Sequence, residues 1–486
     1  MTLSIRNIYQ QQGISFPVIS IKQNHEMHFG LPTSIKKAHS VFSSKNDGNG
    51  FDCGCRKSNS LKLVILPKIL TKEFGEVVPS WVSAAKRDSR TGAQIRTIKG
   101  VLTQSRISGT DFPLKPWHHS YDWNYFVKTD KQFFYLNSPA NGKYDAKNQI
   151  AVMECEWDSK FVPLWSLPMP GDRIQVTGRW IYDCGHPKNG KHRSEIHPPK
   201  AVVSFREETD LFSGNKGLSR ANQAIVYINK KGGYINQKIN DQNYTFDLYL
   251  PPKPSDSSIP KFKVKKMIAS AINPIITPFP SDDPKLLRVT IPLKGKNIPS
   301  ENYGVMISGG WSDPKGIDAK HIKKVTVAVR EAVFKKDKDP DGIIFKKQDE
   351  WYLYVGINGR WRLFESMDKG KRTLNHKVVL HLHKTQHVKI STNGYEADPI
   401  HDILGKSVGL SSKVASSSSL NSQERKTAGE GIRKGFLKLG TDLLEGGDIE
   451  NDKIGIVNAT FPSGKRSTNS VVTSNLGDYQ ITVNIT

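Results

Sequence analysis

The chain has 486 residues and a mass of 54.4 kDa, enough for about two to four domains with cores of their own. Its net charge of +25 and pI near 9.6 favour polyanionic partners, such as nucleic acid or an anionic membrane surface. Mean hydropathy is −0.49, and the longest apolar run falls short of the ~18–20 residues that a membrane span needs. These values exclude an integral membrane protein with a helical span.

Cysteine usage and the N-terminal residues indicate the compartment. The chain has four cysteines, too few for a disulfide framework: Cys53, Cys55, Cys155 and Cys184. The first 20 residues lack the apolar stretch and small-residue cleavage site of a signal peptide. We expect a cytoplasmic protein, with peripheral attachment to a membrane as the alternative.

Periodicity and composition predict a mainly β protein in six segments. In chain order they are a mostly disordered basic segment (1–89), a five-stranded barrel (90–208), a linker (209–244), an antiparallel β-sandwich (245–405), a low-complexity linker (406–431), and a short helix with C-terminal strands (432–486). Net charge is +10 in residues 1–110, +1 in 111–208 and +9 in 245–405. The basic character therefore lies on either side of the predicted barrel.

Five extended segments between residues 95 and 206 predict the barrel: IRTIKGVLTQSRI, YDWNYFVKTD, IAVMECEW, PGDRIQVTGRWIYD and SEIHPPKAVVSFR. Gly100 and Gly178 would allow the tight coiling that a small barrel needs. The strand rhythm and the phrase GDRIQVTGRW resemble OB-fold barrels. The resemblance implies a module that binds oligonucleotides or oligosaccharides, with single-stranded nucleic acid as one candidate ligand.

The predicted barrel is rich in polar side chains of the types that bind metals. Cys184, His186 and His197, with either His119 or Asp122, would give a zinc site with an open position. Glu195 shares a strand face with His197 and would then act as general base in a hydrolase. The alternative is a polar network that ties the barrel loops together. The phrase DCGH…EIHPP is similar to one in uncharacterised microbial proteins.

Aromatic residues crowd the same segment, and two interpretations stay open. Tyr121, Trp123 and Tyr125 alternate on one strand face, and Trp180 lies on another strand. Bases or sugars stack on platforms of this kind. Core aromatics give the same pattern, and a position in the core is the more common one for large aromatic side chains.

Two acidic loops are the main feature of residues 245–405, where eight short strands predict a sandwich. The first loop holds Asp337, Asp339 and Asp341, and the second holds Glu396, Asp398 and Asp402. Carboxylates at such spacing suit Ca²⁺, which binds several oxygen ligands. Strands flank the first loop, and Gln348 stands where an EF-hand loop has Glu, so an EF-hand is rejected.

The acidic loops and their order resemble those of C2 domains, with residues 396–405 following the late loop of that family. The resemblance implies Ca²⁺-dependent or charge-driven binding to anionic phospholipid. Five lysines flank the first loop and suit such a surface: Lys335, Lys336, Lys338, Lys346 and Lys347. The leading expectation is therefore a non-enzymatic protein that binds an anionic surface. The alternatives are a single-stranded nucleic-acid-binding protein and a zinc-dependent hydrolase.

Overall fold

The computed structural model shows a mainly β protein. It describes residues 81–83, 95–107, 122–138, 141, 151–158, 162–188, 191–209, 220–229, 243–253, 255–278, 286–293, 302–312, 321–335, 350–367, 370–397 and 452–486. Among these residues, no helix has the length and apolar character that crossing a bilayer requires. The predicted disordered segment (1–89, apart from 81–83), the linker 406–431 and the short helix lie outside the described residues.

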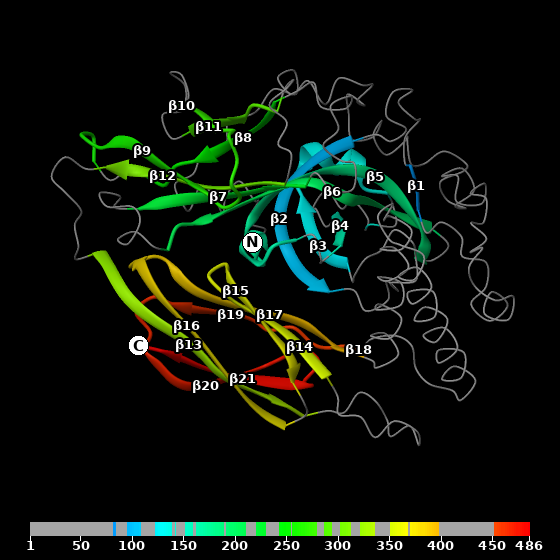
Figure 1. The fold of residues 1–486 in the computed structure, drawn as a ribbon, viewed down its shortest axis with the longest axis vertical. Coiled ribbons are helices and arrows are strands. Elements are labelled where there is room, and N and C mark those ends of the chain that lie inside the picture. Colours follow the sequence, from blue (N-terminus) through cyan, green and yellow to red (C-terminus); the bar gives the residue numbers. More distant parts are fainter. Residues whose placement is uncertain are drawn as a thin grey trace, which may run out of the picture.

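Five strands close into a barrel, drawn in blue, cyan and green in Figure 1. They pair in the order β5–β2–β3–β4–β6, and β6 pairs with β5 to complete the ring. The β4–β6 pairing is parallel, whereas the other four are antiparallel. The strands are β2 (Ile95–Ile107), β3 (Asp122–Thr129), β4 (Val152–Asp158), β5 (Arg173–Lys188) and β6 (Lys191–Glu207). The predicted five-stranded barrel is confirmed.

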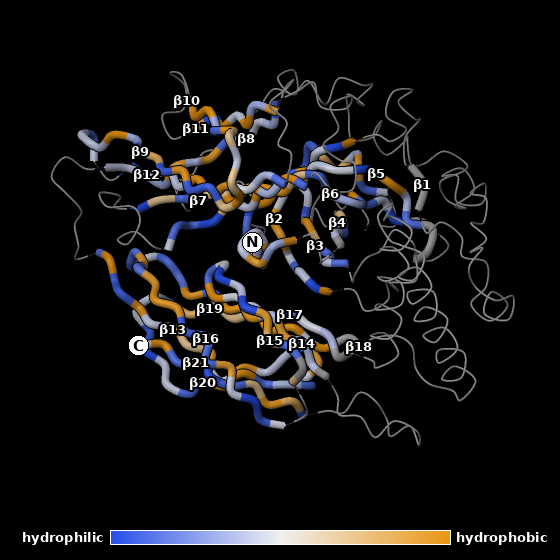
Figure 2. The backbone as a smooth tube through the Cα atoms, viewed as in Figure 1, coloured by the Kyte–Doolittle hydropathy of each residue, from blue (hydrophilic) through white to orange (hydrophobic). Residues whose placement is uncertain are grey.

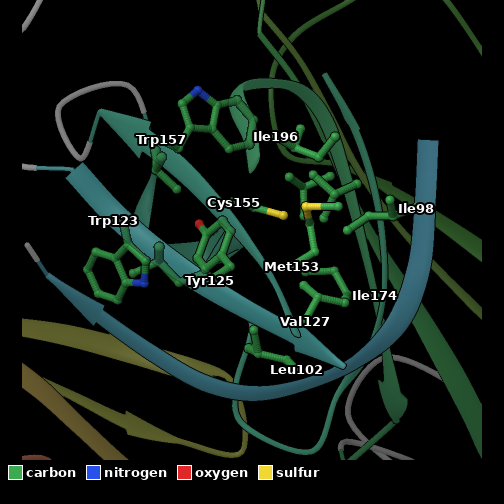
Figure 3. Packing of buried hydrophobic residues seen from close by; sticks show 14 of the residues in the cluster. Ile98, Leu102, Trp123, Tyr125, Val127, Met153, Cys155, Trp157, Ile174 and Ile196 are labelled. Carbon is green, nitrogen blue, oxygen red and sulfur yellow. The ribbon is translucent and has the colours of Figure 1, made fainter. Parts of the chain in front are cut away.

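Three short elements accompany the barrel strands: β1 (Trp81–Ser83), which pairs with β5, and the 3-10 helices η3 (Lys131–Leu136) and η6 (Leu164–Ser166). Alternate strand residues point inward and form a continuous apolar core (Figure 3). Gly178 is needed where the strands coil closely, because a Cβ there would lie 2.6 Å from the Ile196 side chain and the Pro198 carbonyl. Gly178 therefore has the role that the sequence predicts for it.

The barrel sheet continues beyond β6 into a nine-stranded sheet that adds three more strands. These are β7 (Ala221–Ile228), β12 (Tyr303–Ser312) and β9 (Ile259–Lys266). A separate three-stranded sheet contains β8 (Tyr244–Tyr249), β10 (Ile275–Pro278) and β11 (Leu286–Ile291). Apolar residues of both sheets form a second buried cluster, so this extension has a core of its own.

The prediction of a linker over 209–244 is wrong in part. Strand β7 lies inside this segment and pairs with both β6 and β12. Nearly every residue of β7 is buried, because the strand is covered on both faces. Such a strand reads as a continuous apolar run instead of an alternating one. The Gly, Asn and Lys residues that follow it dominate the composition of the segment and hide the signal.

Two antiparallel sheets form a β-sandwich, drawn in yellow and red in Figure 1. One contains β16 (Gly370–His383), β13 (Ile322–Phe334), β21 (Tyr479–Ile485) and β20 (Ser467–Thr473). The other contains β15 (Arg360–Met367), β14 (Glu350–Ile357), β17 (His387–Ala397), β18 (Asp452–Lys453) and β19 (Asn458–Pro462). Hydrophobic and hydrophilic residues alternate along many of these strands (Figure 2), and the hydrophobic ones meet between the sheets.

The sandwich has different boundaries from the predicted 245–405. Strands β8 to β12 belong to the barrel side of the molecule, and strands from the C-terminal segment complete the sandwich. Strand β21 is central, because it lies between β13 and β20 and buries every second side chain. A sandwich built from 322–397 alone would lack β21, and β13 would then be an unpaired edge strand on that side.

The barrel and the sandwich pack against each other through the turn between β14 and β15. Asn358 and Gly359 both have positive φ, as expected for the tight Asn-Gly hairpin turn. Next to the turn, Trp361 donates from Nε1 to the Leu167 carbonyl at 3.0 Å. The Trp123 and Tyr354 rings meet edge to face with centroids 4.8 Å apart. These contacts join the two units through buried and half-buried side chains.

Candidate functional site

The outer wall of the barrel over β3, β4 and β6 carries a group of polar side chains. Because Trp123 and Tyr125 point into the core, Asn124 between them points outward. The same alternation places Glu154 and Glu156 outside, on either side of buried Cys155. The wall therefore presents one row of polar residues from each strand.

Strand register brings these rows together. Asn124 on β3 pairs with Glu156 on β4, and Glu154 pairs with Glu195 on β6 in the parallel ladder. Continuing that ladder by two residues places His197 beside Glu156. We call this group the wall cluster: Asp122, Asn124, Glu154, Glu156, Glu195 and His197.

Asp122, Glu156 and His197 offer three ligand atoms, one from each strand, that all lie within 4.8 Å of one another. His197 Nδ1 is 2.9 Å from Glu156 Oε2, and His197 Nε2 is 3.7 Å from Asp122 Oδ2. Asp122 is 1% exposed, and the side chains of Glu156 and His197 are only 13% and 12% exposed. Two carboxylates and an imidazole in this arrangement are a donor set that could hold a divalent metal ion.

Glu154 and Glu195 lie next to this donor set and, with Glu156, have ligand atoms within 4.8 Å of one another. Asn124 Nδ2 donates to Glu154 Oε1 at 2.8 Å and to Glu156 Oε1 at 2.7 Å. One amide group thus fixes the orientation of two carboxylates. Support of this kind positions metal ligands in many proteins.

Two arginines partly offset the negative charge of the wall cluster. Arg193 Nη1 lies 2.9 Å from Glu154 Oε2, and Arg106 Nη2 lies 3.8 Å from Glu154 Oε1. The cluster has four carboxyl groups against these two guanidinium groups, so its formal charge is two units negative when all four are ionised and His197 is neutral. A divalent cation would neutralise that charge.

Burial shifts the pKa values of two residues of these strands. It raises the pKa of the Glu195 carboxyl well above its ordinary value, and the nearby carboxylates of Glu156, Asp183 and Glu154 add to the effect. Arg193 partly opposes it. Burial also raises the pKa of the Cys155 thiol, which lies on the core side of β4. Cys155 is therefore an uncharged core residue, not a reactive thiol.

The predicted zinc ligands are only partly brought together. His197 and Asp122 belong to the donor set, Glu195 lies beside it, and His119 is outside the described residues. Cys184 and His186 lie on β5, where the structure describes their backbone.

Strand register separates Cys184 and His186 from His197. Trp180 pairs with Ile196, next to His197, and Cys184 is four residues further along β5, or about 13 Å. Ligands of one zinc ion must all lie within about 2.3 Å of it, so a site that joins Cys184 or His186 to His197 is incompatible with this register. Glu156 takes their place in the donor set. The pattern Glu-x-Glu on one strand face was the sequence signal for it.

The aromatic residues considered for stacking are core residues. Trp123 and Tyr125 are each 1% exposed and Trp180 is 5% exposed, and Figure 3 shows the first two inside the barrel. Trp180 also donates from Nε1 to the Leu136 carbonyl at 2.9 Å. Barrel residues cover these rings, together with Tyr354 and Trp361 of the sandwich in the case of Trp123, which corrects the stacking prediction for these three. Tyr121 lies outside the described residues.

The strand ends that carry the two predicted calcium loops lie side by side. Glu350, the first residue of β14, pairs with Ala397, the last residue of β17. The first loop therefore ends next to the point where the second begins. Of the loop acids, the structure describes the backbone of Glu396, and the rest lie outside the described residues: Asp337, Asp339, Asp341, Asp398 and Asp402.

Lys335 is exposed at the end of β13, where it precedes the first acidic loop. The other flanking lysines lie outside the described residues: Lys336, Lys338, Lys346 and Lys347. The calcium site thus stays a prediction.

No protein-family model matches this chain, and no curated protein matches it at a significant level.

Proposed function

We propose that this protein is a metal-dependent hydrolase whose barrel holds a divalent cation through Asp122, Glu156 and His197. One observation carries the proposal, namely three donor atoms from three strands within 4.8 Å of one another. The three residues are far apart in sequence, so the barrel topology creates the donor set. Their burial adds support, because enclosed carboxylates are stabilised by a bound cation.

The donor types favour zinc. An imidazole nitrogen suits Zn²⁺ better than it suits Ca²⁺ or Mg²⁺, and carboxylate oxygens complete many zinc sites. Three protein ligands leave one position for water, which distinguishes catalytic zinc sites from structural ones with four. The ion would supply an acidified water as nucleophile. Glu195 is the neighbouring carboxyl group that would exchange a proton with it.

The wall that carries the cluster is also where an OB-like barrel would bind a ligand. The pairing order and the parallel β4–β6 contact are similar to those of OB-folds, in which the face of strands 2 and 3 is the binding face. The equivalent strands here are β3 and β4. In this interpretation, the cation lies on the ligand-binding face of the module.

Metal content of the purified full-length protein tests the proposal. We expect close to one equivalent of Zn²⁺ by elemental analysis, and a rise in melting temperature when Zn²⁺ is added to metal-free protein. Glu156→Gln and His197→Gln should each lose both effects. Glu331→Gln, on the sandwich surface, is the matched control and should keep them. Absence of zinc binding by the unsubstituted protein would refute the proposal.

A second candidate function is Ca²⁺-dependent binding of a C2-like sandwich to anionic phospholipid. The pairing of Glu350 with Ala397 favours it, because the strand ends next to the two acidic loops then lie at one end of the sandwich. Sedimentation with phosphatidylserine vesicles, with and without Ca²⁺, tests it. We expect Asp398→Asn and Asp402→Asn to abolish pelleting. Pelleting that is independent of Ca²⁺ in all variants would contradict it.

A further inference from the structure

Arg106 and Arg193 flank the wall cluster from opposite sides. Arg106 is on β2, where it pairs with Asn124, and Arg193 is on β6, two residues before Glu195 on the same face. Both guanidinium groups reach Glu154, one at each carboxylate oxygen. The wall therefore has a row of positive groups directly beside its negative ones.

The hydrogen-bond donors of these two arginines are largely unused. A guanidinium group has five N–H donors. In the part of the chain that the structure describes, Arg193 donates one hydrogen bond to Glu154, and Arg106 donates none. The Nε atoms of both are buried and have no hydrogen-bond partner. Arg106 is held in place by stacking, with Cζ 4.8 Å from the Phe126 ring centroid.

Neutralisation of Glu154 does not account for this arrangement. One arginine at 2.9 Å is sufficient to pair a single carboxylate. The second, at 3.8 Å, makes no hydrogen bond to Glu154. Buried N–H groups without acceptors are rare in folded proteins, and a water, an ion or a ligand is among the explanations for them. Each arginine side chain remains about a third exposed, at 36% and 31%, so a ligand has access.

We propose that Arg106 and Arg193 bind the phosphate group of a phosphate-ester substrate next to the cation held by Asp122, Glu156 and His197. This inference rests on the proposed function. A phosphate has oxygens in a tetrahedral arrangement, so one can face the cation while others accept from two separate guanidinium groups. A phosphate presents its oxygens in more directions than a carboxylate, whose two oxygens lie in one plane.

The charge of the wall determines whether a phosphate can bind. Without a cation the carboxylates outnumber the arginines, and they repel a phosphate. With a divalent cation the wall is close to neutral and has a positive centre for one oxygen. Phosphate binding should therefore depend strictly on the metal.

Calorimetric titration of the full-length protein with inorganic phosphate tests the inference, with the zinc content of each sample measured first. We expect zinc-loaded protein to bind phosphate and metal-free protein to bind it at least tenfold more weakly. Arg106→Gln and Arg193→Gln should each weaken phosphate binding about tenfold or more while zinc content stays the same. Arg362→Gln is the matched control, because Arg362 stacks on Phe364 at the same 4.8 Å but lies on the sandwich.

Different failures have different meanings. If the protein binds zinc and the two arginine variants bind phosphate as tightly as the control does, the inference is wrong and the proposed function stands. If the protein binds no zinc, both are wrong. Methyl phosphate and dimethyl phosphate as competitors identify the source of the group. Stronger competition by the monoester indicates a small phosphorylated substrate, and equal competition indicates a phosphodiester backbone.

Discussion

The outer wall of the barrel and the outer face of the sandwich both consist of pleated strands, but their outward-facing polar side chains differ in how far they are buried. On the sandwich, Lys377 is exposed and Thr482 and Asn484 are half-buried. On the barrel, the outward-facing Glu154 and Glu195 are 5% and 2% exposed. Burying carboxylates lowers stability unless partners compensate for it. The difference is consistent with the binding role proposed here for the barrel wall.

Two ion pairs give this comparison a direct test. Glu154 and Arg193 on the barrel are 2.9 Å apart, and Glu331 and Lys371 on the sandwich are 2.7 Å apart. Their contact distances are alike. Their surroundings differ, since Lys371 is 66% exposed, whereas the Glu154 side chain is 6% exposed.

The largest expected effect is that of Arg193→Ala, measured by urea denaturation of metal-free protein. Removing this partner leaves Glu154 buried with only the more distant Arg106, so the free energy of unfolding should fall by about 2 kcal/mol. Lys371→Ala should leave it unchanged within error, because exposed ion pairs contribute little. Equal effects of the two substitutions would remove the distinction between the two surfaces.

Next in size is the effect of Asn124→Ala on zinc affinity. Asn124 is not a ligand, but it orients Glu154 and Glu156 through its amide group. We expect zinc affinity to fall roughly 10- to 100-fold by calorimetry. Asn484→Ala, on the outer face of the sandwich, should not change it. A normal zinc affinity in Asn124→Ala would mean that the carboxylates are oriented without this residue.

The effect that is smallest over a single pH unit concerns the pH dependence of stability in metal-free protein. The folded-state pKa of Glu195 is raised above its ordinary value of 4.5. Its contribution to stability is therefore full below pH 4.5 and is lost as pH rises through the folded pKa. Glu195→Gln should remove this loss, which is at most about 1.4 kcal/mol per pH unit. An unchanged pH profile in Glu195→Gln would contradict it.

Glu331 on the sandwich should show the opposite sign. Its hydrogen bond to Lys371 lowers its pKa, as does that to Thr482, so its contribution is present at neutral pH and is lost as pH falls through the folded pKa. Urea denaturation of Glu331→Gln across pH 3–8 provides the comparison with Glu195→Gln.

The barrel strands could be predicted because they bury one face and leave a period of two. The segment IRTIKGVLTQSRI coincides with β2 (Ile95–Ile107), and the closed barrel follows from five such segments. The extension was missed because β7 is buried on both faces and has no alternation to detect. The sandwich boundary was missed because β21 pairs with a strand about 150 residues away in the chain.

Half of the candidate site could be predicted in the same way. Alternation places Glu154 with Glu156 on one strand face, and Glu195 with His197 on another. These two pairs of residues come together only through the parallel pairing of β4 with β6, which no local pattern specifies. Cys184 was assigned wrongly because it is near His197 in the sequence, whereas the long β5–β6 hairpin moves it away.

The parallel β4–β6 contact is also the shortest ladder of the barrel, with two residue pairs where β5 and β6 form many. Glu156 and His197 come directly after those two pairs, one on each strand. An ion held between them would link β4 to β6 at the place where the barrel has the fewest backbone pairs. Local separation of β4 from β6 would then release the ion. Removal of the ion would in turn allow the amides of β4 and β6 to exchange before those of any other barrel strand.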